Sequence, residues 1–272
     1  MGESGNVPPG VDPTVPSAAR MYDYGLGGKD NFEIDRQIGD QMRAKFPQLS
    51  DLARGNRNCL IRCVEYLARD RGIKRFLDIG SGLPTQENVH QVIQRVHPDA
   101  RTVYVDSDPT ARVHALALLD GDPRTSFIQA DAADPAAILN HPDTQELLSA
   151  GEPVAVLWFA VAHFLPDSAD PRGAIARLMA AVPSGSVLAL SHVTSDGIDP
   201  DVDRGFRDGG FYDRVPTPLV MRTEKQVAAL FGGLPIVGGR LVEVGEWGRT
   251  DAGAPRTGTK PLRALFGYAV KP

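Results

Sequence analysis

The sequence predicts one α/β domain of the doubly wound kind, with a mostly parallel seven-stranded sheet and helices on both of its faces. Three observations predict this fold. Five short apolar stretches alternate with helical patterns between residues 75 and 192, Asp-Pro pairs stand where several helices should begin, and two further apolar stretches near the C-terminus have no helix between them. Alternating strands and helices form a parallel sheet, because each crossover is right-handed and lays its helix against the sheet. The last two stretches should form an antiparallel hairpin.

The composition is that of an ordinary globular protein. The chain has 272 residues, of which 42% are hydrophobic and 23% are charged, close to the usual proportions. Residues 1–16 contain four prolines and several glycines, which predicts a flexible tail. The remaining residues, 17–272, contain no further linker and should form a single domain.

Charge and hydropathy exclude several classes of partner. With 29 basic and 34 acidic residues the formal net charge is -5, and no segment has a dense basic run, so we expect no nucleic-acid partner. The longest apolar run, residues 154–162, is much shorter than the roughly 20 residues of a membrane span, and the polar start does not resemble a signal peptide. We therefore expect a soluble, cytoplasmic protein without membrane contact, whose oligomeric state the sequence does not indicate.

Helical patterns come before the first strand. One covers residues 32–46, and a clearer one covers residues 52–69, where Leu60, Val64 and Leu67 recur on one face with Cys63. The two cysteines, Cys59 and Cys63, both lie on this second helix. We expect them to be buried apolar residues rather than a redox or metal-binding pair.

The sheet is predicted strand by strand. The five parallel strands should be residues 75–79, 102–105, 126–129, 154–160 and 186–192. Asp-Pro pairs at 108–109, 134–135 and 170–171 supply an N-cap and a proline at the first helical position. Thr223 and Gln226 form a capping box for a later helix, and residues 240–247 and 264–270 are the hairpin strands. Ligands of such sheets bind beyond the carboxyl ends of the strands.

The first strand ends in polar and small residues that suit a ligand site. It brings Asp78 to the sheet edge, followed by Gly80, Ser81 and Gly82. Glycines allow the backbone to approach a ligand that a side chain would push away. A Gly-x-Gly turn can also be nothing more than a tight connection, so this feature needs support from other strands.

The second and third strands supply that support. Asp106, followed by Ser107, lies 24 positions after Gly82, where α/β nucleotide sites place the carboxylate that accepts hydrogen bonds from the ribose hydroxyls. Asp131 and Ala132 follow the third strand and offer a carboxylate and a backbone N–H to an adenine edge. Together these residues predict an adenosine site.

Three further observations concern the identity of the ligand. Phe159, in the fourth strand, either stacks near the adenine or fills the core, and Arg57 is a candidate partner for a cofactor carboxylate. The Gly-x-Gly-x-x-Gly pattern of dinucleotide sites is incomplete, because Thr85 stands at its third glycine. An NAD-dependent dehydrogenase is therefore the disfavoured alternative.

Several segments resemble a family of bacterial S-adenosyl methyltransferases. The segments are residues 15–32 (VPSAARMYDYGLGGKDNF), 77–85 (LDIGSGLPT), 103–109 (VYVDSDP), 162–167 (AHFLPD) and 191–193 (SHV). The resemblance covers nearly the whole chain from residue 16. It implies the class I methyltransferase fold and S-adenosyl-L-methionine as the cofactor. It does not identify the methyl acceptor, which we expect to be a small molecule.

The N-terminal segment of this resemblance is the basis of a lid hypothesis. We expect residues 22–32 to fold over the cofactor, with Tyr22, Lys29 and Asn31 in contact with it and with glycines that let the backbone bend. Residues 17–72 would then be a helical cap over the cofactor site. The alternative is a glycine-rich linker between the tail and the first helix.

Two histidines are candidates for a catalytic base. His163 and His192 follow the fourth and fifth strands and should face the cofactor cleft, and a hydroxyl acceptor would use a general base. Alternatively, His163 packs its loop against the cofactor and His192 is a hydrogen-bonded residue at a strand end. The histidines show no metal-ligand spacing, so no metal site is predicted.

The acceptor site is less well indicated. No Asn-Pro-Pro-Tyr or Asp-Pro-Pro-Tyr run follows the fourth strand, so methylation of a base amine by that device is disfavoured. Residues 196–222 are rich in glycine and aromatic residues, and we expect them to cover an acceptor site. A non-catalytic regulator that binds S-adenosylmethionine would lack such a site and is the alternative to an enzyme.

Overall fold

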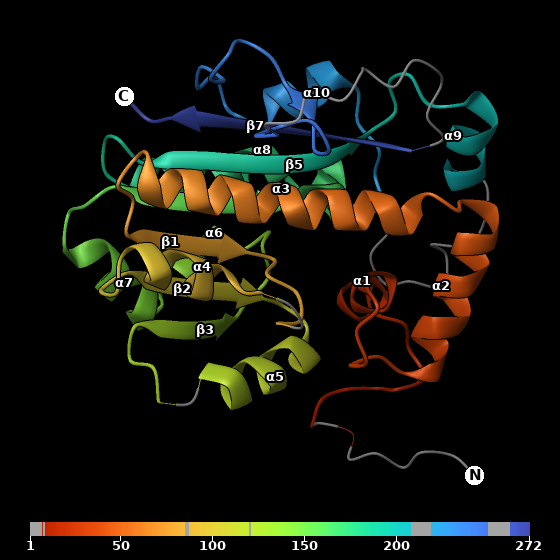
Figure 1. Cartoon of the computed structure of the whole chain (residues 1–272), viewed down its shortest axis with the longest axis horizontal. Coiled ribbons are helices and arrows are strands. Elements are labelled where there is room, and N and C mark those ends of the chain that lie inside the picture. Colours follow the sequence, from red (N-terminus) through yellow and green to blue (C-terminus); the bar gives the residue numbers. More distant parts are fainter. Residues whose placement is uncertain (1–6, 8, 85–86, 120, 208–218, 250–261) are drawn as a thin grey trace.

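The computed structural model describes residues 7, 9–84, 87–119, 121–207, 219–249 and 262–272. Its centre is a seven-stranded sheet with the order β3-β2-β1-β4-β5-β7-β6 (Figure 1). The strands are β1 (Arg75–Ile79), β2 (Arg101–Asp106), β3 (Thr125–Gln129), β4 (Val154–Phe159), β5 (Val187–Thr194), β6 (Val242–Glu243) and β7 (Arg263–Val270). The first five pair in parallel, and β7 is antiparallel to β5 and β6. The predicted fold is confirmed.

Helices cover both faces of the sheet. They are α1 (Ala18–Leu26), α2 (Glu33–Lys45), α3 (Leu49–Arg69), α4 (Val89–Val96), α5 (Pro109–Leu119), α6 (Pro135–Asn140), α7 (Pro142–Ser149), α8 (Pro171–Ala181), α9 (Pro200–Arg207) and α10 (Glu224–Ala229), with 3-10 turns η1 (Ala162–Phe164) and η2 (Asp167–Ala169). Strand β4 shows why two layers are needed. Its alternate residues Val156 and Trp158 belong to a core with α6, α7, α8 and α10, whereas Leu157 and Phe159 belong to a core with α3 and α4.

The predicted capping devices are present. Asp134 accepts a hydrogen bond from the backbone N–H of Ala137 at 3.0 Å, and Asp170 accepts one from Gly173 at 2.9 Å. Thr223 and Gln226 form the predicted capping box of α10. These helices therefore begin where a side-chain oxygen satisfies an N–H group that the helix itself leaves unpaired.

The predicted burial of the two cysteines is also confirmed. Cys59 and Cys63 are free thiols buried in the core beneath α3. Burial raises the pKa of the Cys59 thiol to about 12, so the reactive thiolate is disfavoured at neutral pH. Among the described residues, no helix is both long enough and apolar enough to span a membrane.

Strand β6 is much shorter than predicted. The sequence pattern extended it over residues 240–247, but only Val242 and Glu243 pair with β7 as a strand. The chain then turns, and the carbonyl oxygens of Val244 and Trp247 accept hydrogen bonds from Arg62 on α3, at 3.0 and 2.7 Å. These carbonyls are directed to a helix side chain, so they do not extend the sheet.

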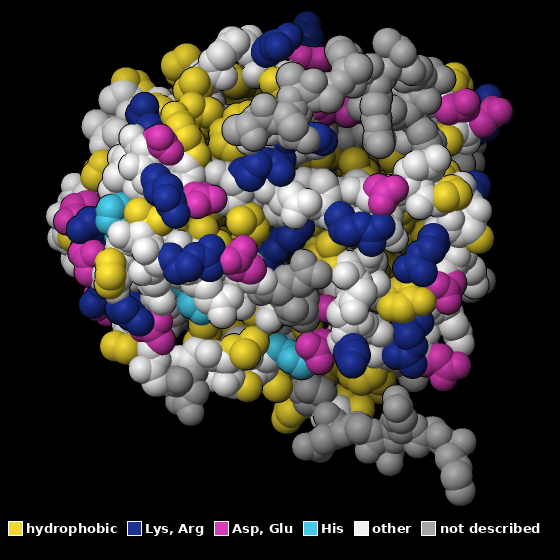
Figure 2. All heavy atoms as spheres, in the orientation of Figure 1, with side chains coloured by type: hydrophobic (Ala, Val, Ile, Leu, Met, Phe, Trp, Pro, Cys, Tyr) yellow, Lys and Arg dark blue, Asp and Glu magenta, His cyan; other side chains and the backbone are white. Residues whose placement is uncertain are grey.

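The N-terminal helices stand beside the sheet rather than on it. Figure 1 shows α1 and α2 at one side, near the carboxyl ends of β1, β2 and β3, while α3 runs across a face of the sheet. Helix α1 was not predicted, because residues 22–32 were interpreted as a lid whose glycines let the backbone bend around the cofactor. Over the face that carries α3, basic and acidic side chains are interspersed (Figure 2).

Candidate functional site

The carboxyl ends of β1, β2, β3 and β4 and the N-terminal segment enclose a first cavity of about 520 Å³. Most of the residues that the sequence predicted as cofactor ligands line it. They are Tyr22, Arg57, Asp78, Gly80, Ser81, Gly82, Asp106, Ser107, Asp131, Ala132 and Phe159. The structure thus brings together the ends of four strands that are separated in the sequence, as a parallel sheet requires.

The two glycines after β1 have different roles. Both have a left-handed backbone, with φ of 64° at Gly80 and 65° at Gly82. A Cβ on Gly80 would lie 1.7 Å from Cγ2 of Val161, whereas a Cβ on Gly82 would meet nothing within 4 Å. Gly80 therefore lets the loops after β1 and β4 pack together, and Gly82 keeps space open at the cavity wall.

Asp106 joins two loops of this cavity. Its carboxylate accepts hydrogen bonds from the backbone N–H of Gly82 at 2.8 Å and from that of Asp108 at 2.9 Å. Burial raises the pKa of Asp106 to about 6, and these N–H donors act in the opposite direction. A carboxylate held in this way has lone pairs left for two ligand hydroxyls.

Asp78 and Arg57 both lie on the cavity wall, and neither forms an ion pair with a described residue. Asp78 is only 4% exposed, and burial raises its pKa to about 7, with the charge of Arg57 acting against the rise and that of Asp106 adding to it. Nη2 of Arg57 donates to the carbonyl of Glu87, whereas its buried Nε has no hydrogen-bond partner among the described residues. An unpaired carboxylate and an unpaired guanidinium N–H suit the ammonium and carboxylate of an amino acid.

The overall charge of the cavity wall is acidic. Its described lining includes five aspartates, at positions 12, 78, 106, 108 and 131, and two arginines, at positions 20 and 57. Arg20 is already neutralised, because its Nε lies 2.7 Å from the buried carboxylate of Asp35. Such a wall attracts a cationic ligand and disfavours a pyrophosphate, which carries negative charge.

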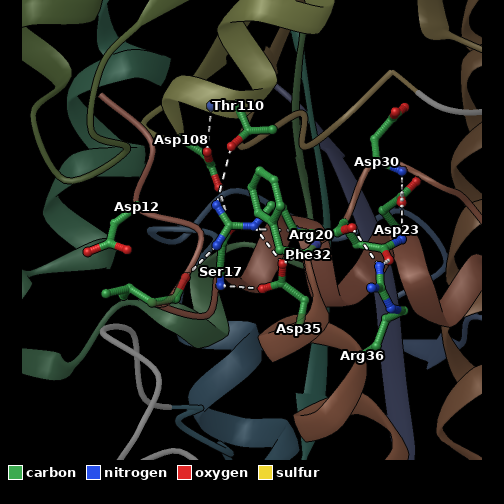
Figure 3. Close-up of polar contacts among 12 residues, drawn as sticks. Asp12, Ser17, Arg20, Asp23, Asp30, Phe32, Asp35, Arg36, Asp108 and Thr110 are labelled. Atoms are coloured by element: carbon green, nitrogen blue, oxygen red, sulfur yellow. Dashed lines mark hydrogen bonds and ion pairs between the residues drawn. The ribbon is translucent and has the colours of Figure 1, made fainter. Parts of the chain in front are cut away.

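Arg20 ties the N-terminal segment to the sheet edge (Figure 3). Besides Asp35, it donates to Oγ1 of Thr110 at 3.3 Å and to the carbonyl of Val15, and its guanidinium lies 4.9 Å from the centre of the Phe32 ring. The hydroxyl of Ser17 bonds to Asp108 in the loop after β2. This network fixes the start of α1 against the loop after β2 and the start of α5.

The cavity wall also includes part of the predicted tail. Residues 10–12 and 15–16 line the first cavity together with the start of α1. The sequence analysis assigned these residues to a flexible tail because of their prolines. In the structure this part of the tail packs against the domain and forms turns, in one of which the N–H of Val15 donates to the carbonyl of Asp12 at 3.3 Å.

Two residues of the predicted lid lie outside both cavities. Lys29 is exposed, and neither Lys29 nor Asn31 lines the first or the second cavity. The side-chain amide of Asn31 donates to Asp23 at 2.9 Å and to the carbonyl of Gly28 at 3.1 Å. A Cβ on Gly28 would lie 1.8 Å from Oδ1 of Asp23. This turn therefore wraps the buried carboxylate of Asp23.

A second, smaller cavity of about 120 Å³ adjoins the first. The two share a wall that consists of Ala18, Tyr22, Asn56, Ala160 and Phe164. Helices α1, α2 and α3 supply much of the remaining lining, together with β5, β7 and the loop after β4. Leu219 also lines it. The predicted cover of the acceptor site was residues 196–222, and of these residues 208–218 lie outside the described residues.

A chain of hydrogen bonds holds the shared wall. Asn56 donates to the Tyr22 hydroxyl at 3.1 Å and accepts from the Ser191 hydroxyl at 2.6 Å, and Ser191 accepts from the N–H of Ala160 at 2.9 Å. Ala160 has a φ of 57°, a conformation that costs free energy for residues other than glycine. Asn56 was not predicted as a site residue. The sequence feature that could have identified it is its position on the apolar face of α3, the face that also carries Cys59.

The two candidate catalytic histidines both line the second cavity, but their surroundings differ. His192 is fully buried, its Nε2 accepts from Nη1 of Arg222 at 2.9 Å, and its Nδ1 bonds to the carbonyl of Val193. Arginine is always protonated, so we assign the donor role at Nδ1. Burial lowers the pKa of His192 to about 4. Both nitrogens are engaged, which fits the alternative role of a hydrogen-bonded strand-end residue.

His163 is nearly as buried but is not engaged in this way. It is 6% exposed, and its Nδ1 has no hydrogen-bond partner among the described residues. Burial lowers its pKa well below the ordinary value, and His192 and Arg222 act in the same direction. His163 is therefore a neutral imidazole at neutral pH that lines the second cavity, and its buried Nδ1 is not hydrogen-bonded to any described residue.

Arg222 locks the loop that carries His163, and the sequence analysis did not identify it. The guanidinium is 3% exposed; it donates to the carbonyls of Ala162 and Leu165, both at 2.9 Å, and lies 2.6 Å from the carboxylate of Asp167. No local pattern around Arg222 signals this role, because its partners lie 30 to 60 positions away in the chain. The loop after β4 is held from outside the cavity.

Comparison with known proteins gives a consistent result. The sequence model of a family described as S-adenosyl methyltransferase matches residues 4–272. A DUF574 family protein from Streptomyces avermitilis MA-4680 is 37% identical, with a TM-score of 0.87 over 95% of this chain and 98% of that one. A Thermobifida fusca YX protein, assigned provisionally as a methyltransferase, is 35% identical, with a TM-score of 0.89 over 97% of each chain.

A more distant likeness concerns the fold alone. The plantazolicin methyltransferase BamL, solved with S-adenosylhomocysteine and a triazolic desmethylPZN analogue, is 10% identical, with a TM-score of 0.50 over 93% of this chain and 95% of that one. No protein with a curated description matches the sequence.

Proposed function

Because this chain belongs to the S-adenosyl methyltransferase family, whose cofactor is S-adenosyl-L-methionine, we propose that it methylates a small-molecule acceptor. The cofactor occupies the first cavity and the acceptor occupies the second. The observation that carries the proposal is the shared wall, since an acidic cavity and a largely apolar one meet at Tyr22, Asn56, Ala160 and Phe164. A soluble, cytoplasmic enzyme is part of the same proposal.

The residues of the first cavity fit this cofactor. Asp106 would accept hydrogen bonds from the ribose hydroxyls, and Asp131 and Ala132 would face the adenine edge, beside Phe159. The methionine part carries an ammonium and a carboxylate, and Asp78 and Arg57 offer one unpaired group to each. Gly82 leaves the space that such a ligand requires.

The protein contributes mainly position and electrostatics. When bound, the cofactor supplies a methyl group on a positively charged sulfur, which any well-aligned lone pair can attack. The acidic wall favours that positive charge, and the hydrogen-bonded chain from Tyr22 through Asn56 to Ser191 fixes the wall between the two ligands. Holding two reactants in one geometry is itself a large part of catalysis.

The alternatives fit the cavities less well. An NAD-dependent enzyme would bring a negatively charged pyrophosphate against a wall with five aspartates. The charge of Arg57 compensates for one of these carboxylates. A regulator without catalytic activity would have no need for a second cavity lined by an imidazole with an unpaired nitrogen. Both alternatives remain separate outcomes of the test.

Calorimetry followed by a transfer assay tests the proposal. We expect saturable binding of S-adenosylmethionine and S-adenosylhomocysteine, and no comparable binding of NAD. Label from methyl-tritiated cofactor should then appear in the small-molecule fraction of a bacterial extract rather than in its protein or nucleic acid. NAD binding without cofactor binding would overturn the proposal, and cofactor binding without transfer to any fraction would favour the regulator.

A further inference from the structure

We propose that the second cavity receives a ring-sized apolar group bearing a neutral hydroxyl, and that His163 accepts the proton of that hydroxyl during methyl transfer. This inference rests on the proposed function and names its acceptor class. The product would be a methyl ether.

The size and lining of the second cavity point to an apolar ring. Its volume is about 120 Å³, and apolar cavities of about 150 Å³ hold one benzene molecule. Apolar side chains from separate elements surround it, among them Met21, Met42, Leu49, Leu52, Leu219 and Leu262. Such walls favour an apolar occupant, because burying its surface removes it from water.

The charges around the cavity exclude an ammonium acceptor. Among the described residues that line it, none is an aspartate or glutamate. The one charged lining side chain there, Arg43, lies 3.5 Å from Asp40 and 5.0 Å from the centre of the Tyr24 ring. An ammonium group would be buried without a carboxylate partner, which is costly. A neutral polar group avoids that cost.

His163 is the one lining histidine whose hydrogen bonds are incomplete. Its ring packs edge-on against His192 at 5.4 Å and against Phe164 at 4.6 Å, yet its buried Nδ1 has no hydrogen-bond partner in the part of the chain that the structure describes. A buried polar atom without a partner destabilises a protein unless a ligand or water completes it. His192 cannot serve this purpose, because Arg222 and Val193 already occupy its two nitrogens.

The transfer step balances with His163 as the base. The acceptor oxygen forms a bond to the methyl carbon, the carbon–sulfur bond breaks, and its electron pair remains on sulfur in S-adenosylhomocysteine. The hydroxyl proton passes to the imidazole and later to solvent. The positive charge thus moves from sulfur to His163, so the total charge of the two cavities is unchanged, which offsets the cost of charging a buried imidazole.

The first experiment measures fragment binding to the full-length protein saturated with S-adenosylhomocysteine. The probes are phenol, toluene, benzylamine and benzoate, which share a ring and differ in the polar group. We expect phenol to bind at least threefold more tightly than toluene and at least tenfold more tightly than the two charged probes. Equal or tighter binding of benzylamine or benzoate would overturn the acceptor class.

A pair of variants places the phenol in the second cavity. Gly25 is on α1 and lines this cavity, and a Cβ there meets nothing within 4 Å. Gly25→Leu should fill the cavity and weaken phenol binding at least tenfold, while Gly25→Ala, which changes the backbone in the same way, should weaken it less than threefold. Unchanged binding in folded Gly25→Leu would show that phenol binds elsewhere.

The role of His163 has its own test. In a panel of phenols and ring alcohols, His163→Gln should lower kcat for methyl ether formation at least 100-fold, with KM changed less than threefold. Equal kcat values would overturn the base role, and the absence of any methyl ether from the panel would overturn the acceptor class. Failure of the wild-type protein to bind S-adenosylhomocysteine would instead contradict the proposed function itself.

Discussion

The two cavities are constructed in different ways. The first is lined by loops that follow β1, β2, β3 and β4, and its described wall has five aspartates. The second is lined largely by apolar faces of α1, α2 and α3 and has two histidines but no carboxylate among its described residues. The first cavity is therefore determined by short motifs at strand ends, whereas the second is determined by packing between helices that are distant in the sequence.

The largest expected effect concerns the contact between the loops after β1 and β4 at the first cavity. Gly80→Ala should lower the free energy of unfolding by about 2 to 5 kcal/mol, because its Cβ would lie 1.7 Å from Val161 and its backbone is left-handed. Gly82→Ala should cost only about 1 to 2 kcal/mol, the left-handed strain alone, yet weaken cofactor binding. Equal unfolding free energies in chemical denaturation would contradict this distinction.

The next effect separates the cavities by binding. Asp106→Ala should weaken S-adenosylhomocysteine binding by about 1.5 to 3 kcal/mol, since a charged acceptor for hydrogen bonds is lost. Phenol binding to the second cavity should stay within twofold. Calorimetry with each ligand checks both, and Asp106→Asn, which retains an acceptor oxygen, should be affected less. An unchanged cofactor affinity in folded Asp106→Ala would place the ribose elsewhere.

The two cavities should also differ in their response to pH. Buried Asp78 and Asp106 have pKa values of about 7 and about 6, so both are largely protonated at pH 5 and ionised at pH 8. Affinity for the cationic cofactor should therefore rise at least about tenfold over this range. Binding of neutral phenol should stay constant, because the pKa of His192 is about 4 and that of His163 is well below normal.

The same groups set the opposite trend for stability without ligand. Their pKa values in the folded state lie above the ordinary value of 3.8. They therefore stabilise the fold most below about pH 4, and this contribution is lost as the pH rises through 6 and 7. Thermal unfolding of Asp78→Asn should show a weaker decline over this range; an identical decline would assign it to other groups.

The smallest effects test the N-terminal wall. Tyr22→Phe removes a hydroxyl that bonds to Asn56 and to the carbonyl of Ala53, both at 3.1 Å, and should cost about 1 kcal/mol of stability. Lys29→Ala should change stability and cofactor affinity by less than about 0.5 kcal/mol, because the side chain is exposed. A larger loss of affinity in Lys29→Ala would restore it to the site.

The parts of the molecule that sequence predicted are those in which neighbouring residues act together. Asp134 and Asp170 cap helices three residues away from their partners, so the device is readable in the sequence. Asp78 and Asp106 lie at the carboxyl ends of β1 and β2, and Gly82 follows β1, so the order of strands and helices fixes the sheet edge that they reach. The lining of the first cavity was therefore largely predictable.

The remainder depends on contacts between distant positions. Asn56 and Ser191 are 135 positions apart, and Arg222 reaches His192 and the loop after β4 across 30 positions or more. Segment 22–32, which was predicted as a lid over the cofactor, shows a different limit. Its contacts are local, because the side chain of Asn31 donates a hydrogen bond to the buried Asp23 of the same segment. A single sequence does not show whether a glycine-rich polar segment surrounds a ligand or its own side chain.

A crystal structure of the protein with S-adenosylhomocysteine tests the central claim most directly. We expect the adenosine to bind against Asp106 and Asp131 in the first cavity. The sulfur should lie at the wall formed by Tyr22, Asn56 and Ala160 and face the second cavity. A ligand whose sulfur points away from this wall, or one that occupies the second cavity, would contradict the division of the site into a cofactor cavity and an acceptor cavity.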